Sequence, residues 1–194
     1  MAHADPITTL FSTGVDASGN PLANGTVDSH YTVNGGNAYV IGNPASVGWV
    51  GNTGTSTWIS PALDTFAIGG PYTYHTTFDL TGFDPGTAVI TGQMAADDQA
   101  VIYLNGTMVF TGALDATAPW TYLQSFSITS GFIAGMNSLD IVVPNDVETG
   151  VNDGPTGVQL ALSGTASAVP EPATLSLIGM GLALTALARR RRTV

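Results

Sequence analysis

The chain has 194 residues, 44% of them hydrophobic and 9% charged, which fits one folded domain with a sizeable core and excludes a disordered chain. It contains no Cys, so disulfides, thiolate nucleophiles and zinc-thiolate sites are excluded. Its formal net charge is -10, and all four basic residues stand in one C-terminal run. The rest of the chain is therefore an anion that repels nucleic acid, and its natural binding partners are divalent cations.

Residues 1–4 are a possible remnant of a signal peptide. Ala2 and Ala4 form the small-x-small pattern that precedes a signal-peptidase cut, just before Asp5 and Pro6. The basic and apolar regions that should come first are missing from the sequence. A truncated signal peptide and a flexible tail therefore both stay open.

Alternating apolar and polar residues predict an all-β domain over residues 5–164. The clearest stretch is 72–80, where Tyr72, Tyr74 and Phe78 face one way and His75 and Asp79 the other. About eight to ten short antiparallel strands, with turn residues between them, favour a β-sandwich or jelly roll. The further strands are expected at residues 31–33, 38–41, 57–59, 87–94, 99–104, 107–110, 122–128, 138–143 and 157–162.

Two turns connect neighbouring strands in this prediction. Gly-Phe-Asp-Pro-Gly at residues 82–86 supplies turn chemistry, so the strands at 72–80 and 87–94 are expected to pair as antiparallel neighbours. Asn105-Gly106 is typical of a type I′ hairpin and predicts that the strands on either side of it pair directly.

Asp97 and Asp98 are the first candidate metal ligands. No Lys or Arg precedes residue 189 to neutralise them, so the two carboxylates either stay in water or gather a hard cation through oxygen ligands. The expected ion is Ca²⁺. The alternative is a solvated turn in which Asp side chains bond to nearby backbone groups.

A second acidic loop, residues 145–154, contributes Asp146 and Asp153 to the same prediction. The loop is rich in oxygen donors but lacks the spacing of an EF-hand, and a solvated loop is the alternative. A shared ion requires this loop to lie close to Asp97 and Asp98, because calcium ligands lie at about 2.3 to 2.6 Å.

Aromatic residues offer apolar platforms on which a sugar ring could stack. Trp120, which follows Pro119, is the candidate expected to be exposed, and Tyr103 and Asn105 are the further candidate ligand-binding residues. Core packing is the alternative for the aromatic residues, including Trp49 and Trp58. No catalytic motif is present, so we expect a protein that is not an enzyme, with a polysaccharide-active hydrolase as the lesser alternative.

The C-terminal end departs from this pattern. Residues 165–172 are expected to form a linker, and residues 173–194 an apolar helix with a basic end. The apolar stretch at 173–188 would span about 24 Å as a helix at ~1.5 Å per residue, marginal for a bilayer core. The basic run would stay on the cytoplasmic side and leave the bulk of the chain across the membrane.

This end of the chain resembles the PEP-CTERM sorting signal, which is also catalogued as an ice-binding-protein C-terminal region. The resemblance implies an exported protein of a Gram-negative bacterium, anchored transiently in the inner membrane and recognised by an exosortase, then released to the cell surface or extracellular matrix. The matching residues, besides the apolar run, are Val169, Pro170, Glu171, Pro172, Arg189, Arg190, Arg191 and Arg192.

Two weaker resemblances concern residues 30–164. Trp49 and the stretches 58–61, 96–106 and 155–158 resemble the galactose-binding-like jelly rolls often attached to this signal. The Asp97-Asp98 pair resembles the calcium site of protective-antigen-like lectin domains in yeast adhesins. Together they imply a carbohydrate-binding or adhesive module acting on extracellular polysaccharide, with a ligand-free structural matrix or biofilm protein as the alternative.

Overall fold

A computed structural model describes residues 4–112, 118–146 and 153–169 of the chain. The predicted C-terminal helix at 173–194 and residues 1–3 of the possible signal-peptide remnant lie outside these ranges. Within them, no helix is long and apolar enough to span a membrane.

The described residues form an all-β fold, as predicted, with two short 3₁₀ helices. The strands are shorter or longer than the sequence pattern indicated, but every predicted strand corresponds to an observed one. Their bounds are β1 (Ala4–Pro6), β2 (Val27–Val33), β3 (Gly36–Ile41), β4 (Trp58–Ser60), β5 (Phe66–Ile68), β6 (Gly70–Asp79), β7 (Phe83–Asp97), β8 (Val101–Leu104), β9 (Thr107–Thr111), β10 (Gln124–Ile128), β11 (Met136–Asn145), β12 (Asp153–Pro155) and β13 (Gly157–Ala168), with the helices η1 (Pro44–Val47) and η2 (Pro119–Thr121).

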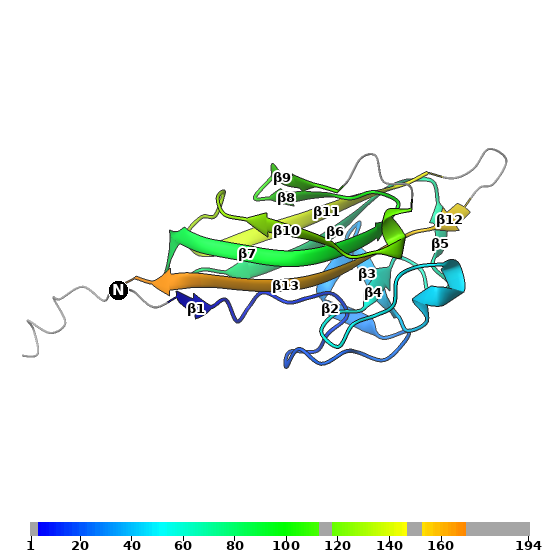
Figure 1. Ribbon diagram of the computed structural model, residues 1–194, viewed down its shortest axis with the longest axis horizontal. Coiled ribbons are helices and arrows are strands. Elements are labelled where there is room, and N and C mark those ends of the chain that lie inside the picture. The colour runs from blue at the N-terminus through cyan, green and yellow to red at the C-terminus, as the bar shows by residue number, and fades with distance from the viewer. Residues whose placement is uncertain (1–3, 113–117, 147–152, 170–194) are drawn as a thin grey trace, which may run out of the picture.

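The strands build a β-sandwich from one continuous, folded-over sheet. Its order is β10-β7-β13-β4-β3-β2-β6-β11-β8-β9, and β1 pairs with β13. Figure 1 shows β10, β7 and β13 as one layer in front of β6, β11, β8 and β9. A separate two-stranded ribbon, β5 with β12, lies at one end of the sandwich.

The space between the two layers is the main hydrophobic core. Alternate residues of the long strands point into it, so that β11 reads exposed or half-buried and buried in turn along its whole length. The largest fully buried side chains include Tyr31, Tyr74, Phe78, Leu104 and Ile141. The alternation that predicted the strand at 72–80 therefore also identified its core-facing side.

The Asn105-Gly106 hairpin forms as predicted. Leu104 pairs with Thr107, and both central residues have a positive φ, 50° for Asn105 and 77° for Gly106, as a type I′ turn requires.

The predicted pairing across residues 82–86 is wrong. β6 pairs with β2 and β11, whereas β7 pairs with β10 and β13 in the opposite layer. Asp84, Pro85 and Gly86 belong to β7, which starts at Phe83 and crosses to the other layer directly after the turn. The Asp-Pro-Gly sequence marks a change of layer and not a hairpin.

The C-terminal strand is longer than expected. β13 continues to Ala168, through the first part of the predicted linker, and pairs with β7 along its length. The backbone N–H of Val169 then donates to Gly82 O at 2.8 Å, which fixes the end of the described chain beside the start of β7.

A second, smaller core lies outside the sandwich, under the loop that carries η1. Trp49 and Trp58 stack there with ring centroids 4.2 Å apart, and Ile41 and Ala95 complete the cluster. Core packing thus accounts for both tryptophans, and the loop is held against the outer side of β7 and β13 close to Asp97.

Candidate functional site

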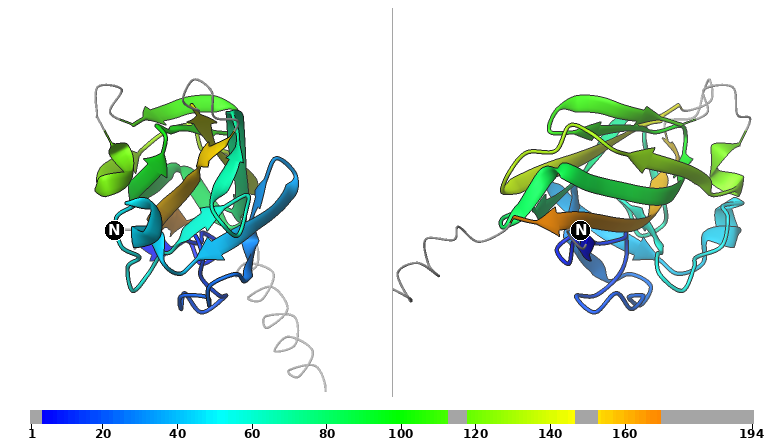
Figure 2. Two further views of the ribbon diagram at one scale, coloured as in Figure 1. Left: turned by 90° about the vertical axis from the view of Figure 1, so that its right-hand side faces the viewer. Right: turned by 60° about the vertical axis from the view of Figure 1, so that its left-hand side comes forward.

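A cleft of about 430 Å³ opens at one end of the sandwich. Among the described residues, its wall combines two carboxylates, an amide, an aromatic ring and two prolines, and it sits between η2 and the end of β11. The lining residues are Asp98, Gln99, Ala118, Pro119, Trp120, Pro144 and Asp146. Figure 2 shows this end of the molecule facing the viewer in its left panel.

Two strand ends bring the acidic residues of the cleft together. Asp98 follows the last residue of β7, and Asp146 follows the last residue of β11. The Asp98 N–H donates to Pro144 O at 3.2 Å, and the Asp146 N–H donates to Asp98 Oδ2 at 2.7 Å. Side chains that stand 48 positions apart in the sequence therefore share one wall of the cleft.

Asp97 is oriented differently from its neighbour. Its side chain is only 6% exposed and turns toward the small outer core, where its Oδ2 accepts a hydrogen bond from Trp49 Nε1 at 2.7 Å. Its backbone carbonyl accepts a hydrogen bond from Thr156 Oγ1 at 2.9 Å. Asp97 thus lies directly behind the cleft, while Asp98 lines it.

Burial shifts the titration of both residues. The pKa of Asp97 is raised to about 7, mainly because burial removes water from its carboxylate. The hydrogen bond from Trp49 lowers this pKa in part, and the nearby Asp98 carboxyl raises it. The pKa of Asp98 is also raised, again mainly by burial. No Lys or Arg occurs before Arg189 to offset these charges. These carboxylates are therefore stabilised either by protonation or by a bound cation.

Trp120 forms the aromatic side of the cleft. It lies in η2, and its backbone carbonyl accepts a hydrogen bond from Val50 N–H at 2.7 Å, which ties η2 to the loop that carries Trp49. The Trp120 side chain is half-buried and packs against the small outer core. One part of the ring supports the core, and the other borders the cleft.

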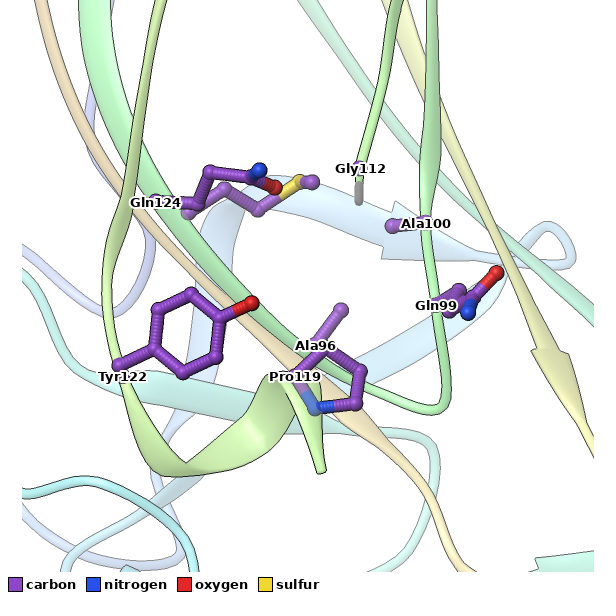
Figure 3. Close-up of a pocket in the computed structure, with 8 residues that line it drawn as sticks. Ala96, Gln99, Ala100, Gly112, Pro119, Tyr122 and Gln124 are labelled. Atoms are coloured by element: carbon purple, nitrogen blue, oxygen red, sulfur yellow. The ribbon is translucent and has the colours of Figure 1, made fainter. Parts of the chain in front are cut away.

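A small recess adjoins the cleft on its inner side. Gln99 and Pro119 line both spaces, and the Tyr122 hydroxyl points into the recess (Figure 3). Its volume of about 10 Å³ is the size of one water molecule. The cleft, and not this recess, has room for an organic ligand.

Two of the other predicted site residues, Tyr103 and Asn105, do not line the cleft. Tyr103 lies in β8, opposite Asp140 of β11. Asn105 uses its side chain in the hairpin, where it donates to Gly131 O and Asn137 Oδ1, both at 2.9 Å. Asp153 starts β12, but its side chain lies outside the described part of the chain. Among the described residues, no three His, Asp or Glu side chains group as a metal site.

The sequence pattern missed two contributors to the site. Trp49 was considered for sugar stacking or for core packing, whereas its hydrogen bond to the Asp97 carboxylate was not predicted. Gln99 was read as the start of a strand, yet it lines the cleft before β8 begins. The adjacency of Gln99 to the Asp pair was a usable signal, whereas nothing local connects Trp49 to a residue 48 positions away.

Several solved structures resemble the fold. CBM35 from Paenibacillus barcinonensis is 19% identical, with 68% of this chain and 92% of that chain covered and a TM-score of 0.38. CsCBM6-3 from Clostridium stercorarium, in complex with cellobiose, is 17% identical, with 73% and 89% covered and a TM-score of 0.36. The arabinose-bound MgGH51 α-L-arabinofuranosidase is 11% identical, with 86% and 31% covered and a TM-score of 0.41.

Likenesses at these identities and TM-scores assign no ligand and no site residue to this chain. No curated protein matches it. A protein-family model matches the C-terminal end of the chain, where Pro-Glu-Pro, an apolar run and four arginines come after β13. Residues 168–192 are a PEP-CTERM protein-sorting motif.

Proposed function

We propose that this protein is an exported carbohydrate-binding or adhesive module that holds neutral extracellular polysaccharide in the cleft at the end of the sandwich. The observation that carries the proposal is the joint lining of this cleft by Trp120, Asp98 and Asp146. A half-buried indole offers an apolar platform for the CH face of a sugar, and the carboxylates offer acceptors for its hydroxyls.

The charge of the site restricts the class of polysaccharide. Asp97, Asp98 and Asp146 together carry up to three negative charges, and no Lys or Arg lies before Arg189. Even with one bound Ca²⁺ the ionised cluster stays negative by one charge. An acidic polysaccharide would be repelled, so the proposed ligand is uncharged.

Calcium is part of the proposal. Asp98 and Asp146 are hard oxygen ligands at the mouth of the cleft, and Asp97 lies behind them, with Asp153 as the predicted fourth residue. The raised pKa values of Asp97 and Asp98 support a cation, because a positive ion would relieve the cost of two partly buried carboxylates. Sugar hydroxyls would complete the oxygen shell of the ion.

Binding without hydrolysis is the proposed activity. A glycosidase needs a carboxylic acid within reach of the glycosidic oxygen and a second carboxylate across the bond. Asp97 has the raised pKa of such an acid, but it is 6% exposed and does not line the cleft. In the described part of the chain, the carboxylates that line the cleft, on Asp98 and Asp146, lie together on one wall.

The sorting motif supports the proposed location. A PEP-CTERM tail would be handled by an exosortase at the inner membrane, and the folded domain would then act at the cell surface or in the extracellular matrix. A ligand at that location has to be extracellular, which agrees with a polysaccharide.

An array of neutral and acidic polysaccharides, probed with Ca²⁺ and then with a chelator, tests the proposal. The protein should be retained on at least one neutral polysaccharide with Ca²⁺ and released by the chelator. Asp98→Asn should abolish retention, whereas Asp140→Asn removes one carboxylate from β11 away from the cleft and should retain it. Absence of retention in both conditions would leave the structural matrix protein as the correct alternative, and release of reducing sugar would indicate a hydrolase.

A further inference from the structure

The short strand β5 exposes large apolar side chains next to the cleft. Phe66 is 43% exposed and Ile68 is 69% exposed. Because alternate residues of a strand share a face, these two side chains lie on the same side of β5, with Ala67 on the other. Phe66 and Ile68 thus form a small exposed apolar face on β5.

The first tie between β5 and the cleft runs through Asn145. This residue is 4% exposed, and its Nδ2 donates to Ala67 O at 2.8 Å and to Ile68 O at 3.1 Å. The next residue, Asp146, lines the cleft and donates its N–H to the Asp98 carboxylate. The Ile68 end of β5 is thus attached to the acidic wall.

The second tie runs through Thr156, which is fully buried. Its N–H donates to Thr65 O at 2.9 Å, directly before β5, and its hydroxyl donates to Asp97 O at 2.9 Å. Both ends of β5 are therefore fixed to residues that build the site. The apolar face has a set position relative to Asp98 and Asp146.

These contacts place three features side by side at one end of the sandwich. η2 with Trp120 borders the cleft on one side, the ends of β7 and β11 form its acidic wall, and β5 is bonded to the last residue of β11. Figure 2 shows η2 and the β5–β12 ribbon on the same end. Asn145 contacts Ile68 and precedes Asp146, so β5 adjoins the acidic wall of the cleft.

We propose that the face of Phe66 and Ile68 is a second subsite, so that the protein binds a polysaccharide along its chain and not at a terminal sugar. This inference rests on the proposed function. An uncharged ligand fits both parts of the surface, because sugar hydroxyls suit the acidic wall and the CH faces of later sugar units suit an apolar strand. A protein partner would match only the apolar part.

Titration calorimetry with cello- and xylo-oligosaccharides of two and six units, in Ca²⁺, tests the subsite. The six-unit oligosaccharide should bind about tenfold tighter than the two-unit one, equivalent to ~1.4 kcal/mol. The double variant Phe66→Ala, Ile68→Ser should lose about this tenfold for the longer oligosaccharide only. Ile133→Ser, a similar change at a residue that is 51% exposed at the opposite end of the sandwich, should change neither affinity.

The outcomes separate this inference from the function on which it rests. Equal affinity for both lengths, or equal loss for both lengths in the double variant, would overturn the second subsite and leave binding in the cleft intact. If neither series binds to the unaltered protein, the second subsite for these sugars is overturned, and the proposed function fails only if the array also retains no neutral polysaccharide. If light scattering shows a dimer that the double variant abolishes, the occupant of β5 is a second copy and the inference is wrong.

Discussion

Adjacent residues at this site have different surroundings, which the sequence alone does not show. Asp97 and Asp98 are adjacent and joined by a cis peptide bond, yet one is buried beside Trp49 and the other lines the cleft. Trp49 itself has two roles, since it stacks on Trp58 and donates to Asp97. The carboxylate pair is therefore one solvent-facing group supported by one buried group.

The buried carboxylate predicts an unusual pH dependence of stability. The pKa of Asp97 is about 7 in the folded protein, above its ordinary 3.8, so between these values the folded state keeps a proton that the unfolded state has released. In a chelator, the free energy of unfolding should fall by ~3 kcal/mol from pH 5 to pH 8 through this group. Chemical denaturation at several pH values measures it.

Asp97→Asn should remove this part of the pH dependence, because the amide does not titrate. Asp64→Asn, which removes an exposed carboxylate and leaves the surroundings of Asp97 intact, is the matched control. A slope that is the same in Asp97→Asn and in the unaltered protein would show that Asp97 does not hold its proton near neutral pH.

At the scale of elements, packing against the outer core fixes the site. β13 runs beneath Trp49, and a Cβ placed on Gly157 would lie 2.6 Å from the Trp49 ring and 3.0 Å from Ile59 O. Only Gly allows the strand and the indole to approach so closely. The position of Trp49, and through it of Asp97, therefore depends on a glycine at the start of β13.

Gly157→Ala should destabilise the protein by ~1–3 kcal/mol, because the added methyl group overpacks the contact and displaces the indole. Thermal unfolding and tryptophan fluorescence measure both effects. Gly51→Ala adds the same methyl group in the neighbouring loop, where nothing lies within 4 Å, and should be neutral. Equal stabilities of the two variants would contradict the close packing of Trp49 on β13.

The sequence predicted these elements unevenly, and the reason is physical. Alternation and the Asn105-Gly106 turn are local signals, so the strand at 72–80 and the hairpin were found. The pairing of β7 with β13 joins residues far apart in the chain, and nothing near residues 82–86 distinguishes a hairpin from a change of layer. β1, β5 and β12 were not predicted, because three residues are too few to show a clear period. The equally short β4 was predicted from its Trp and Ile, which favour strands.

The same distinction applies to the candidate site. Asp97, Asp98, Asp146 and Trp120 were chosen as residue types able to bind a cation or a sugar, and the structure brings Asp98, Asp146 and Trp120 to one cleft. Asn105 was chosen on the same grounds, but its amide is used by the hairpin. Residue chemistry selected the candidates, whereas strand pairing decided which of them meet.

At the scale of the whole molecule, the ends of the described chain lie at the opposite end of the sandwich from the cleft. β1 pairs with the last part of β13, so both ends of the described chain lie at the same end of the sandwich. β7 runs from this end to the cleft, and its 15 residues span about 50 Å at ~3.3 Å per residue. A protein held by its C-terminal tail would present the cleft away from the membrane (Figure 1).

Coupling the protein to a surface through single introduced cysteines tests this orientation, since the natural chain has none. Ile133→Cys, near the tail, should give a surface that binds the polysaccharide. Gly51→Cys, next to the loop residue that bonds to Trp120, should block binding by more than tenfold at equal protein loading. Equal binding by both surfaces would contradict the placement of the ligand at the cleft end.

Hydrogen exchange with and without a polysaccharide that the protein retains tests the central claim most directly. With Ca²⁺ present, exchange should slow in the peptides that contain Asp98 and Gln99 and in those that contain Trp120, and a chelator should abolish the protection. Protection confined to the tail end of the sandwich, or to the outer face of β10, β7 and β13, would contradict binding in the cleft.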